Sequence, residues 1–440
     1  MNKYLYFITI VATLGGFLFG FDTAVISGAE QSIQQLWVLD EIQHGLTVSI
    51  ALIGTVLGAM FGGWPSDRFG RKYTLFAIAL LYFISALGSA LAGNWYLFLF
   101  FRFIGGLGVG ASSVAAPMYI SEIAPARHRG RLVALFQFNV VLGILIAYVS
   151  NYLIQGSGEN AWRWMLGVEG IPAFAFIALV PFIPRSPRWL IVKQNKIDEA
   201  REIFRKLEPE EYEDEVQRII RTHQMHDRLA KKDRFFQRRY TFPIMLAVLF
   251  AMFNQLSGIN AIIYYAPRIF QNAGLEAGSA LLSTAGVGLI NFIFTIIAIN
   301  LIDRFGRRFL MIIGSLGLIL TLAMTSAAFF FSIGGEIVAV SLFIYIAFFG
   351  FSQGTVIWVF ISEIFPNEVR ANGQALGSFT HWIMASVVAF IVPSAEKIGF
   401  GPTFLFFSLM MVLQLVFVLR MMPETKGVSL EELEEKILKR

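Results

Sequence analysis

The chain has 440 residues, of which 56% are hydrophobic and only 15% are charged. Soluble globular domains carry about 25% charged residues, so the composition excludes an ordinary soluble protein and favours a membrane protein with several spans. Cysteine is absent, which excludes a disulfide framework, a thiolate metal site and a cysteine nucleophile. The net charge of +5 fits cytoplasmic loops and lipid head groups better than it fits a nucleic-acid partner.

Apolar stretches of bilayer-spanning length recur twelve times along the chain. A transmembrane helix needs about 20 mostly apolar residues, and each stretch is close to that length. The first stretch is too long for a signal peptide and lacks a small-residue cleavage site, so it is interpreted as a span. The sequence therefore predicts an all-α membrane protein with twelve transmembrane helices. The predicted spans are 4–28, 45–64, 73–92, 95–120, 132–154, 164–183, 241–266, 278–302, 309–333, 336–361, 372–395 and 400–422.

A charged segment separates the sixth span from the seventh. Residues 185–239 hold 15 lysines and arginines and 11 acids, with helical periodicity, and are predicted to form a soluble linker of short helices. With the N-terminus inside, the short outer loops carry only Arg163, Arg268 and Lys397, whereas the basic loops, the linker and the tail lie inside. This positive-inside pattern predicts that both termini are cytoplasmic.

An internal repeat divides the chain in two. The loop DRFGRK at 67–72 returns as DRFGRR at 303–308, and SEIAPARHR at 121–129 returns as SEIFPNEVR at 362–370. PRSPRWL, from residue 184, is echoed by PETKGVSL, from residue 423. Three matches at nearly one offset indicate two parallel six-helix halves, which typically enclose a site near the membrane midplane. The predicted domains are an N-terminal half (1–184), the linker (185–240), a C-terminal half (241–422) and a cytoplasmic tail (423–440).

These motifs, together with PMYISEIAP and QLSGIN, resemble the sugar porter family of the major facilitator superfamily. The resemblance runs from the first span to the tail, and the motifs have the family's spacing. It implies the major facilitator fold in two pseudo-symmetric halves, a central sugar site and an intracellular helical linker. It also implies a multi-pass protein of the plasma membrane, which is the inner membrane in bacteria. Because the family contains both uniporters and proton symporters, individual residues must decide the mechanism.

Asp22 and Arg102 are charged residues well inside predicted spans, where a charge is costly. The first helix runs outward and the fourth runs inward, so both residues lie roughly 10 Å below the outer surface and can pair. The pair is either a structural salt bridge or a proton switch in which Asp22 takes up a proton when Arg102 moves away. Proton symporters of the family resemble this chain in carrying both residues, whereas many uniporters have an amide in place of the acid. This favours proton coupling through Asp22 and Arg102.

A sugar is uncharged and covered with hydroxyl groups, so its site needs neutral amides and an aromatic face. Any one amide could instead bond a neighbouring helix. Three positions depart from the family pattern. Asn254 replaces a glutamine, and Thr355 follows Gly354 in the tenth span where the family commonly has a proline. His381, which is either a packed histidine or a titrating group, replaces an amide. The resemblance assigns sugar contacts to residues of both halves. They are Gln137, Asn254, Gln255, Asn260, Asn291, Trp358, His381 and Trp382.

Two gates are also predicted. Tyr264 and Tyr265, at the outer end of the seventh span, match an aromatic pair that closes the outer gate in relatives, although an interfacial aromatic belt is the alternative. Acids and arginines at matched positions of both halves form salt bridges at the cytoplasmic gate in the family. The positive-inside rule alone would explain the cations but not the acids. The predicted cytoplasmic gate consists of Arg71, Glu122, Arg129, Arg307, Glu363 and Arg370.

These features predict a proton-coupled symporter that imports a hexose or pentose by alternating access. It is not expected to be an enzyme, because the chain has no nucleotide-binding P-loop, no metal spacing among its five histidines and no catalytic triad. We expect no cofactor and no nucleic-acid partner, only protons, a small-molecule sugar and the lipid bilayer, with function as a monomer. The alternatives are a facilitative sugar uniporter, an exporter of drugs or metabolites, and a non-transporting sugar sensor.

Overall fold

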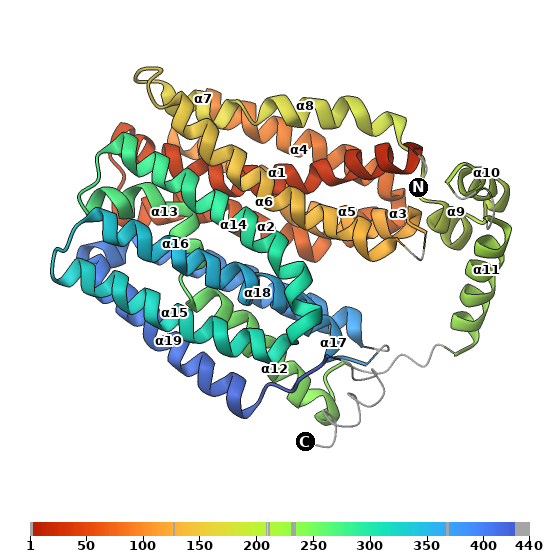
Figure 1. Ribbon diagram of the computed structural model, residues 1–440. Helices are drawn as coiled ribbons and strands as arrows, with labels where there is room; N and C mark the ends of the chain where they lie inside the picture. Colours follow the sequence, from red (N-terminus) through yellow and green to blue (C-terminus); the bar gives the residue numbers. More distant parts are fainter. Residues whose placement is uncertain are drawn as a thin grey trace. The chain divides into compact units, whose positions relative to one another are not determined.

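The computed structural model describes residues 3–125, 128–207, 209, 212–229, 235–366 and 369–426. Their regular structure is helical throughout (Figure 1). Twelve helical stretches among them are long and apolar enough to cross a membrane, which confirms the predicted class and the number of spans. The first span is longer than predicted, because its helix continues past residue 28 to Leu36.

The first six spans come from helices before residue 183. Helix α4 packs against α5 and α8 within this set. The glycine-rich stretch of α5 permits a close helix crossing, since a methyl group at Gly110 would overlap the carbonyl oxygen of Thr55 on α2. The helices are α1 (Lys3–Leu36), α2 (Glu41–Phe61), α3 (Gly63–Phe69), α4 (Arg71–Leu91), α5 (Trp95–Ile123), α6 (Arg129–Ile154), α7 (Ala161–Gly167), α8 (Gly170–Leu179) and the 3₁₀ turn η1 (Val180–Phe182).

The last six spans follow the linker. Helix α15 lies beside α16 and α19 (Figure 1). In the core of this set, the Phe250 ring packs against Phe360 and against Phe417, which lies on α19. The elements are η2 (Arg238–Tyr240), α12 (Thr241–Leu256), α13 (Ile259–Asn272), α14 (Ala277–Phe305), α15 (Arg307–Phe330), α16 (Gly335–Phe351), α17 (Gln353–Glu363), α18 (Arg370–Ile398) and α19 (Phe400–Arg420).

Three of the spans are interrupted helices. The sixth breaks between α7 and α8 at residues 168 and 169, and the seventh breaks between α12 and α13 at Gly258, which has a left-handed backbone (φ 86°). The tenth breaks at Ser352, between α16 and α17. An interrupted helix inside a membrane frees main-chain polar groups, which is tolerated where protein or a substrate cavity surrounds them.

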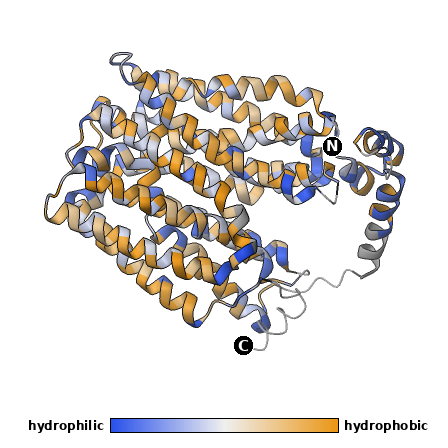
Figure 2. Ribbon diagram, viewed as in Figure 1, coloured by the Kyte–Doolittle hydropathy of each residue, from blue (hydrophilic) through white to orange (hydrophobic). Residues whose placement is uncertain are grey.

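The linker forms three short helices, α9 (Pro187–Gln194), α10 (Ile197–Leu207) and α11 (Tyr212–Leu229). Polar residues alternate with apolar ones on these helices, in contrast to the mostly apolar spans (Figure 2). Their apolar faces form a small core that includes Trp189, Phe204 and Val216. Arg201 on α10 bonds Glu213 on α11 at 2.8 Å, and these hydrogen bonds lower the pKa of the Glu213 carboxyl.

Packing divides the chain into two compact units. The first unit is Met1–Asp22, Ile53–Ile144 and Leu166–Lys232, and the second unit is Thr23–Leu52, Leu145–Met165 and Asp233–Arg440. The division passes through α1, α2, α6 and α7, so the units do not coincide with the halves that the repeat predicts. The six-helix halves and their boundaries therefore stay a prediction from the sequence.

Candidate functional site

A buried ion pair joins α1 to α5 in the first unit. A guanidinium nitrogen of Arg102 lies 2.6 Å from a carboxylate oxygen of Asp22, and a second donates to the Asp22 main-chain carbonyl at 3.1 Å. Both side chains are only 2% exposed. The predicted pairing is confirmed, and it explains how a carboxylate is accommodated inside the first span.

A second acid at this site was not predicted. Glu169 lies at the break between α7 and α8, is 1% exposed, and its carboxyl lies close enough to Asp22 for the two groups to interact electrostatically. Its Oε1 atom has no hydrogen-bond partner among the described residues. Two carboxyls beside the Arg102 guanidinium carry one negative charge more than it neutralises, unless one of them binds a proton. The signal was in the sequence, since Glu169 is a carboxylate inside the predicted span 164–183.

Four of the predicted sugar-contacting residues form one polar cluster in the second unit. Gln255 accepts a hydrogen bond from the Asn260 amide at 2.6 Å and donates to the Asn254 side-chain oxygen at 3.0 Å. The same Gln255 amide nitrogen lies 3.2 Å from both ring nitrogens of His381. The break at Gly258 makes this possible, because it brings the end of α12 and the start of α13 together beside α18.

Two tryptophans adjoin this cluster. The His381 ring centroid lies 4.9 Å from those of Trp358 on α17 and Trp382 on α18. Trp358 is 37% exposed, so part of its ring is open to a ligand, whereas Trp382 is buried. Neutral amides beside an accessible aromatic face suit a polar, uncharged ring such as a sugar.

The other two predicted sugar contacts come from other helices. Gln137 is an exposed residue of α6 in the first unit, and Asn291 is a half-buried residue of α14 in the second unit. Within the described part of the second unit, no hydrogen bond connects the Asn291 amide to Gln255 or its neighbours. Their roles stay predictions.

The tyrosine pair of the predicted outer gate is buried. Tyr264 is 2% exposed, and Tyr265 is fully buried and donates a hydrogen bond to the carbonyl of Ala389 on α18 at 2.9 Å. Tyr148 on α6 donates to the carbonyl of Ile263 at 2.8 Å. Such burial favours a packed closure over an interfacial belt, where the rings would lie at the lipid head groups.

Two matched triads include four of the six predicted cytoplasmic gate residues. In the first unit, Glu122 accepts bonds from Arg71 (2.9 Å) and from the Ser186 hydroxyl (2.5 Å). In the second unit, Glu363 accepts bonds from Arg307 (2.8 Å) and from the Thr425 hydroxyl (2.6 Å). The members of the two triads occupy equivalent places in the internal repeat, including the PRS and PET segments whose hydroxyls were not predicted to contribute.

The remaining predicted gate arginines are not part of these triads. Arg129 has a buried Nε atom without a hydrogen-bond partner in the described part of the chain. Arg370 donates from its Nε atom to the carbonyl of Phe365 at 3.3 Å. Neither arginine pairs with the acid seven residues before it in the described structure, so their part in a gate stays a prediction.

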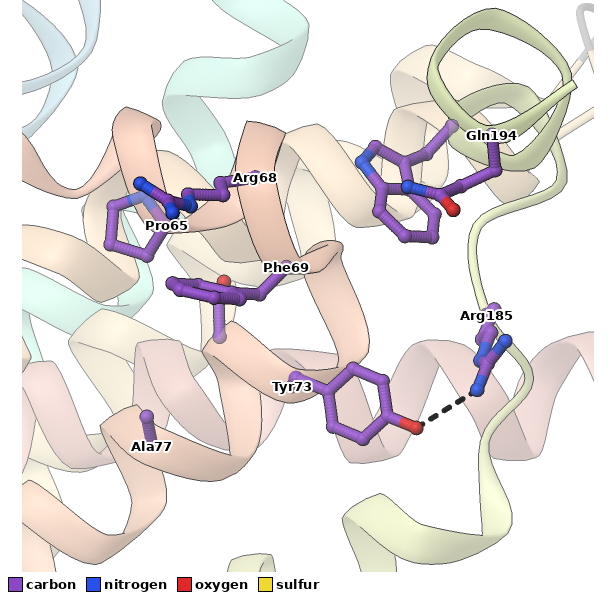
Figure 3. Close-up of a pocket in the computed structure, with 9 residues that line it drawn as sticks. Pro65, Arg68, Phe69, Tyr73, Ala77, Arg185 and Gln194 are labelled. Atoms are coloured by element: carbon purple, nitrogen blue, oxygen red, sulfur yellow. Dashed lines mark hydrogen bonds between the residues drawn. The ribbon is translucent and has the colours of Figure 1, made fainter.

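A cavity of about 650 Å³ opens in the first unit between α3, α4 and the start of the linker (Figure 3). Arg68 and Arg185 line it together with aromatic rings, and Arg185 donates a hydrogen bond to the Tyr73 hydroxyl at 3.0 Å. Two guanidinium groups suit an anion better than a neutral sugar. The lining of this cavity therefore does not suit a neutral sugar.

Comparison with known proteins identifies the family of this chain. The family profile described as "Sugar (and other) transporter" matches residues 8–437. The D-xylose-proton symporter of Escherichia coli (strain K12) is 37% identical over 98% of this chain and 96% of its own. The arabinose-proton symporter of Bacillus subtilis (strain 168) is 36% identical over 97% and 94%. The inward-open structure of the xylose transporter XylE from E. coli covers 98% of this chain and 100% of its own, with 37% identity and a TM-score of 0.87. The chain therefore belongs to the sugar transporter family and is a multi-pass membrane transporter with the major facilitator fold.

Proposed function

We propose that this protein is a proton-coupled monosaccharide symporter that imports sugar by alternating access across a bacterial inner membrane. The observation that carries the proposal is the buried Asp22–Arg102 pair with Glu169 beside it. A carboxyl that exchanges one cation partner for a proton changes its charge state as the helices move, and this couples proton movement to the conformational cycle. The proton is the coupling ion, and no further cofactor takes part.

The amide cluster around Gln255 supplies the sugar site in this proposal. Asn254, Asn260 and His381 orient the hydroxyl groups, and Trp358 covers one face of the ring, with Gln137 and Asn291 contributing from other helices. Because relatives at 36–37% identity are named for D-xylose and arabinose, these two pentoses are the first substrates to test. Hexoses remain in the panel, since neutral amides recognise hydroxyls of either ring size.

The matched triads act at the cytoplasmic side in this proposal, and both termini face the cytoplasm. Each triad holds an acid in place for gating arginines, including Arg129 and Arg370, when the cytoplasmic side closes. The bonds of such a gate are individually weak, about 0–1 kcal/mol when exposed, which suits two states that must interconvert. A single chain provides every residue named here, so the monomer is the proposed functional form.

The test is the sugar-induced pH change in proteoliposomes that contain the purified protein. D-xylose and arabinose are added first and hexoses afterwards, to the wild type and to Asp22→Asn. We expect the wild type to make the outside of right-side-out vesicles more alkaline when sugar is added. Asp22→Asn should lose this proton movement and keep sugar counterflow, because an amide can bond Arg102 but cannot carry the proton.

The control is Asp214→Asn, which makes the same chemical change at an exposed position of the linker helix α11. It should behave as the wild type does. Counterflow without any proton movement in the wild type would make the protein a facilitative uniporter and would reduce Asp22 to a structural partner of Arg102. A wild type that responds to none of the sugars would contradict the sugar assignment itself.

A further inference from the structure

A second buried ion cluster includes Glu30, eight residues after Asp22 on α1, and lies in the second unit. The sequence predicts that Arg268 lies in an outer loop. This prediction is wrong, because Arg268 is a residue of α13, which continues to Asn272. Its guanidinium makes a two-pronged contact with Glu30, from Nε to Oε1 at 3.0 Å and from Nη2 to Oε2 at 2.7 Å. It also donates to Glu396 on α18 at 2.9 Å and to the side-chain oxygen of Gln34 at 2.5 Å.

The centre of the cluster is almost free of solvent. The side chains of Glu30 and of His44, whose Nε2 atom lies 2.6 Å from Glu30, are 0% exposed, and Arg268 is 12% exposed. A two-pronged guanidinium–carboxylate contact is the strongest common form of charged hydrogen bond. In a desolvated setting the two charges hold each other firmly, and removing either partner leaves an uncompensated buried charge.

The cluster joins parts of the chain on opposite sides of the internal repeat. Glu30, Gln34 and His44 precede the predicted boundary at residue 184, whereas Arg268 and Glu396 follow residue 241. By the positive-inside prediction all of these residues lie at the outer end of their spans. An alternating-access cycle must separate the two halves at this end to admit sugar from outside. The Arg268–Glu30 contact lies between segments that have to part.

The cluster is continuous with the predicted outer gate and with the sugar site. Arg268 is one helical turn beyond Tyr265 on α13, and the Tyr265 ring lies 6.1 Å from the His44 ring. Asn260 stands near the start of the same helix. Release of Arg268 therefore frees the helix that carries both gate tyrosines and one sugar-contacting amide.

We propose that Arg268 and Glu30 form the latch of the outer gate. While the latch is closed it holds the outer ends of the two halves together, and it must open in each cycle for sugar to enter from outside. This inference rests on the alternating-access part of the proposed function. The latch sets the balance between the two states of the transporter, and it needs no assumption about which sugar is carried or whether protons accompany it.

The experiment measures the distance between the outer ends directly. The chain has no cysteine, so a spin label at Leu36→Cys on α1 and one at Ile398→Cys on α18 report on that pair alone. Both positions are exposed, at 52% and 75%. Double electron–electron resonance in lipid nanodiscs then gives the distribution of distances between the two labels. It is measured in the wild-type background and in the latch variants Glu30→Gln and Arg268→Gln.

We expect both latch variants to add a longer-distance population and to raise the ratio of open to closed molecules at least about tenfold. The matched control is Glu41→Gln, which removes an acid from the exposed Glu41–Lys397 pair (2.9 Å) between α2 and α18. Exposed pairs contribute about 0–1 kcal/mol, so the control should leave the distribution nearly unchanged.

A distance distribution that stays as in the wild type in both latch variants would overturn the proposal and leave the cluster as a fixed scaffold. Should either single variant fail to fold, the double variant Glu30→Gln/Arg268→Gln removes both charges together. It must then show the longer-distance population, and a wild-type distribution in it would equally overturn the latch. Loss of sugar-driven proton movement has no bearing on this readout, so failure of symport and failure of the latch are distinguishable.

Discussion

Buried carboxylates are tolerated inside this protein because arginines far away in the sequence neutralise their charge. Asp22 depends on Arg102, and Glu30, eight residues later on the same helix, depends on Arg268. Breaking such a buried pair on one side is expected to cost about 3–5 kcal/mol, since the other charge is left without a partner. Our proposals give these two residues of α1 different roles: Asp22 carries the proton, and Glu30 helps to close the outer gate.

Glu169 gives the sharpest prediction at the residue scale. In Glu169→Gln the amide keeps the shape of the side chain, but it cannot ionise. The site then holds one acid beside Arg102 instead of two, so any change of protonation there falls on Asp22 alone. We expect the pH dependence of sugar uptake, measured in vesicles with a fixed sugar gradient, to shift away from that of the wild type.

The matched control for this measurement is Glu336→Gln, the same change at an exposed residue in the first turn of α16. Its pH profile should coincide with that of the wild type. A wild-type profile in Glu169→Gln as well would mean that Glu169 stays neutral through the cycle and acts only as a hydrogen-bond partner.

At the scale of elements, the broken helices decide where the chemistry lies. A continuous seventh span would separate Gln255 and Asn260 by more than a turn and would satisfy all main-chain groups within the helix. The break at Gly258 instead lets their side chains bond each other at 2.6 Å. Glu169 occupies the break of the sixth span in the same way. Polar groups therefore gather where backbone hydrogen bonding is already interrupted.

Gly258→Ala should damage both the fold and the site. A left-handed backbone costs an alanine about 1–2 kcal/mol, and here the new methyl group would also collide with the Phe407 ring. We expect a lower melting temperature in detergent and loss of the stabilisation that sugar gives to the wild type.

Gly274→Ala separates the effect of the strained backbone from the effect of the collision with Phe407. Gly274 also has a left-handed backbone (φ 100°), but nothing lies within 4 Å of the added methyl group. It should lose only about 1–2 kcal/mol and keep sugar-dependent stabilisation. Equal damage in the two variants would show that the Phe407 contact has no part in shaping the site.

At the scale of the whole molecule, equivalent positions of the sequence repeat form equivalent hydrogen-bonded triads. Arg71, Glu122 and Ser186 form one triad, and their counterparts form the other with Thr425 as the hydroxyl. The triads differ in one respect: the Ser186 hydroxyl also accepts a hydrogen bond from the Trp189 backbone N–H and so caps α9.

This difference predicts that removing the two hydroxyls lowers the free energy of unfolding by unequal amounts. Thr425→Val loses one hydrogen bond to a carboxylate, about 1.5–3 kcal/mol, whereas Ser186→Ala loses a similar bond and a helix cap worth about 1 kcal/mol more. Thermal unfolding in detergent should rank Ser186→Ala below Thr425→Val, with Ser279→Ala, an exposed serine, close to the wild type. The reverse ranking would mean that the hydroxyl–carboxylate bonds of the two triads contribute differently to stability.

The sequence by itself determined the features that depend on local composition. A span is a run of apolar residues, a cytoplasmic loop is a cluster of cations, and a repeat is a recurring motif, so the twelve spans, the helical linker and the family could all be predicted. The pairing of Asp22 with Arg102 was predictable as well, because depth in the membrane follows from residue count along two helices.

Only the tertiary structure decided which side chains meet. Glu169 and the Arg268–Glu30 contact depend on where helices break or end and on which faces they turn towards each other. The hydroxyls of Ser186 and Thr425 lie outside the spans and reach their acids through the path of the chain. The sequence order gives no distance between residues that are more than 200 positions apart, as Glu30 and Arg268 are. Such contacts exist only once the helices have packed, and that is the physical reason that they could not be predicted from the sequence.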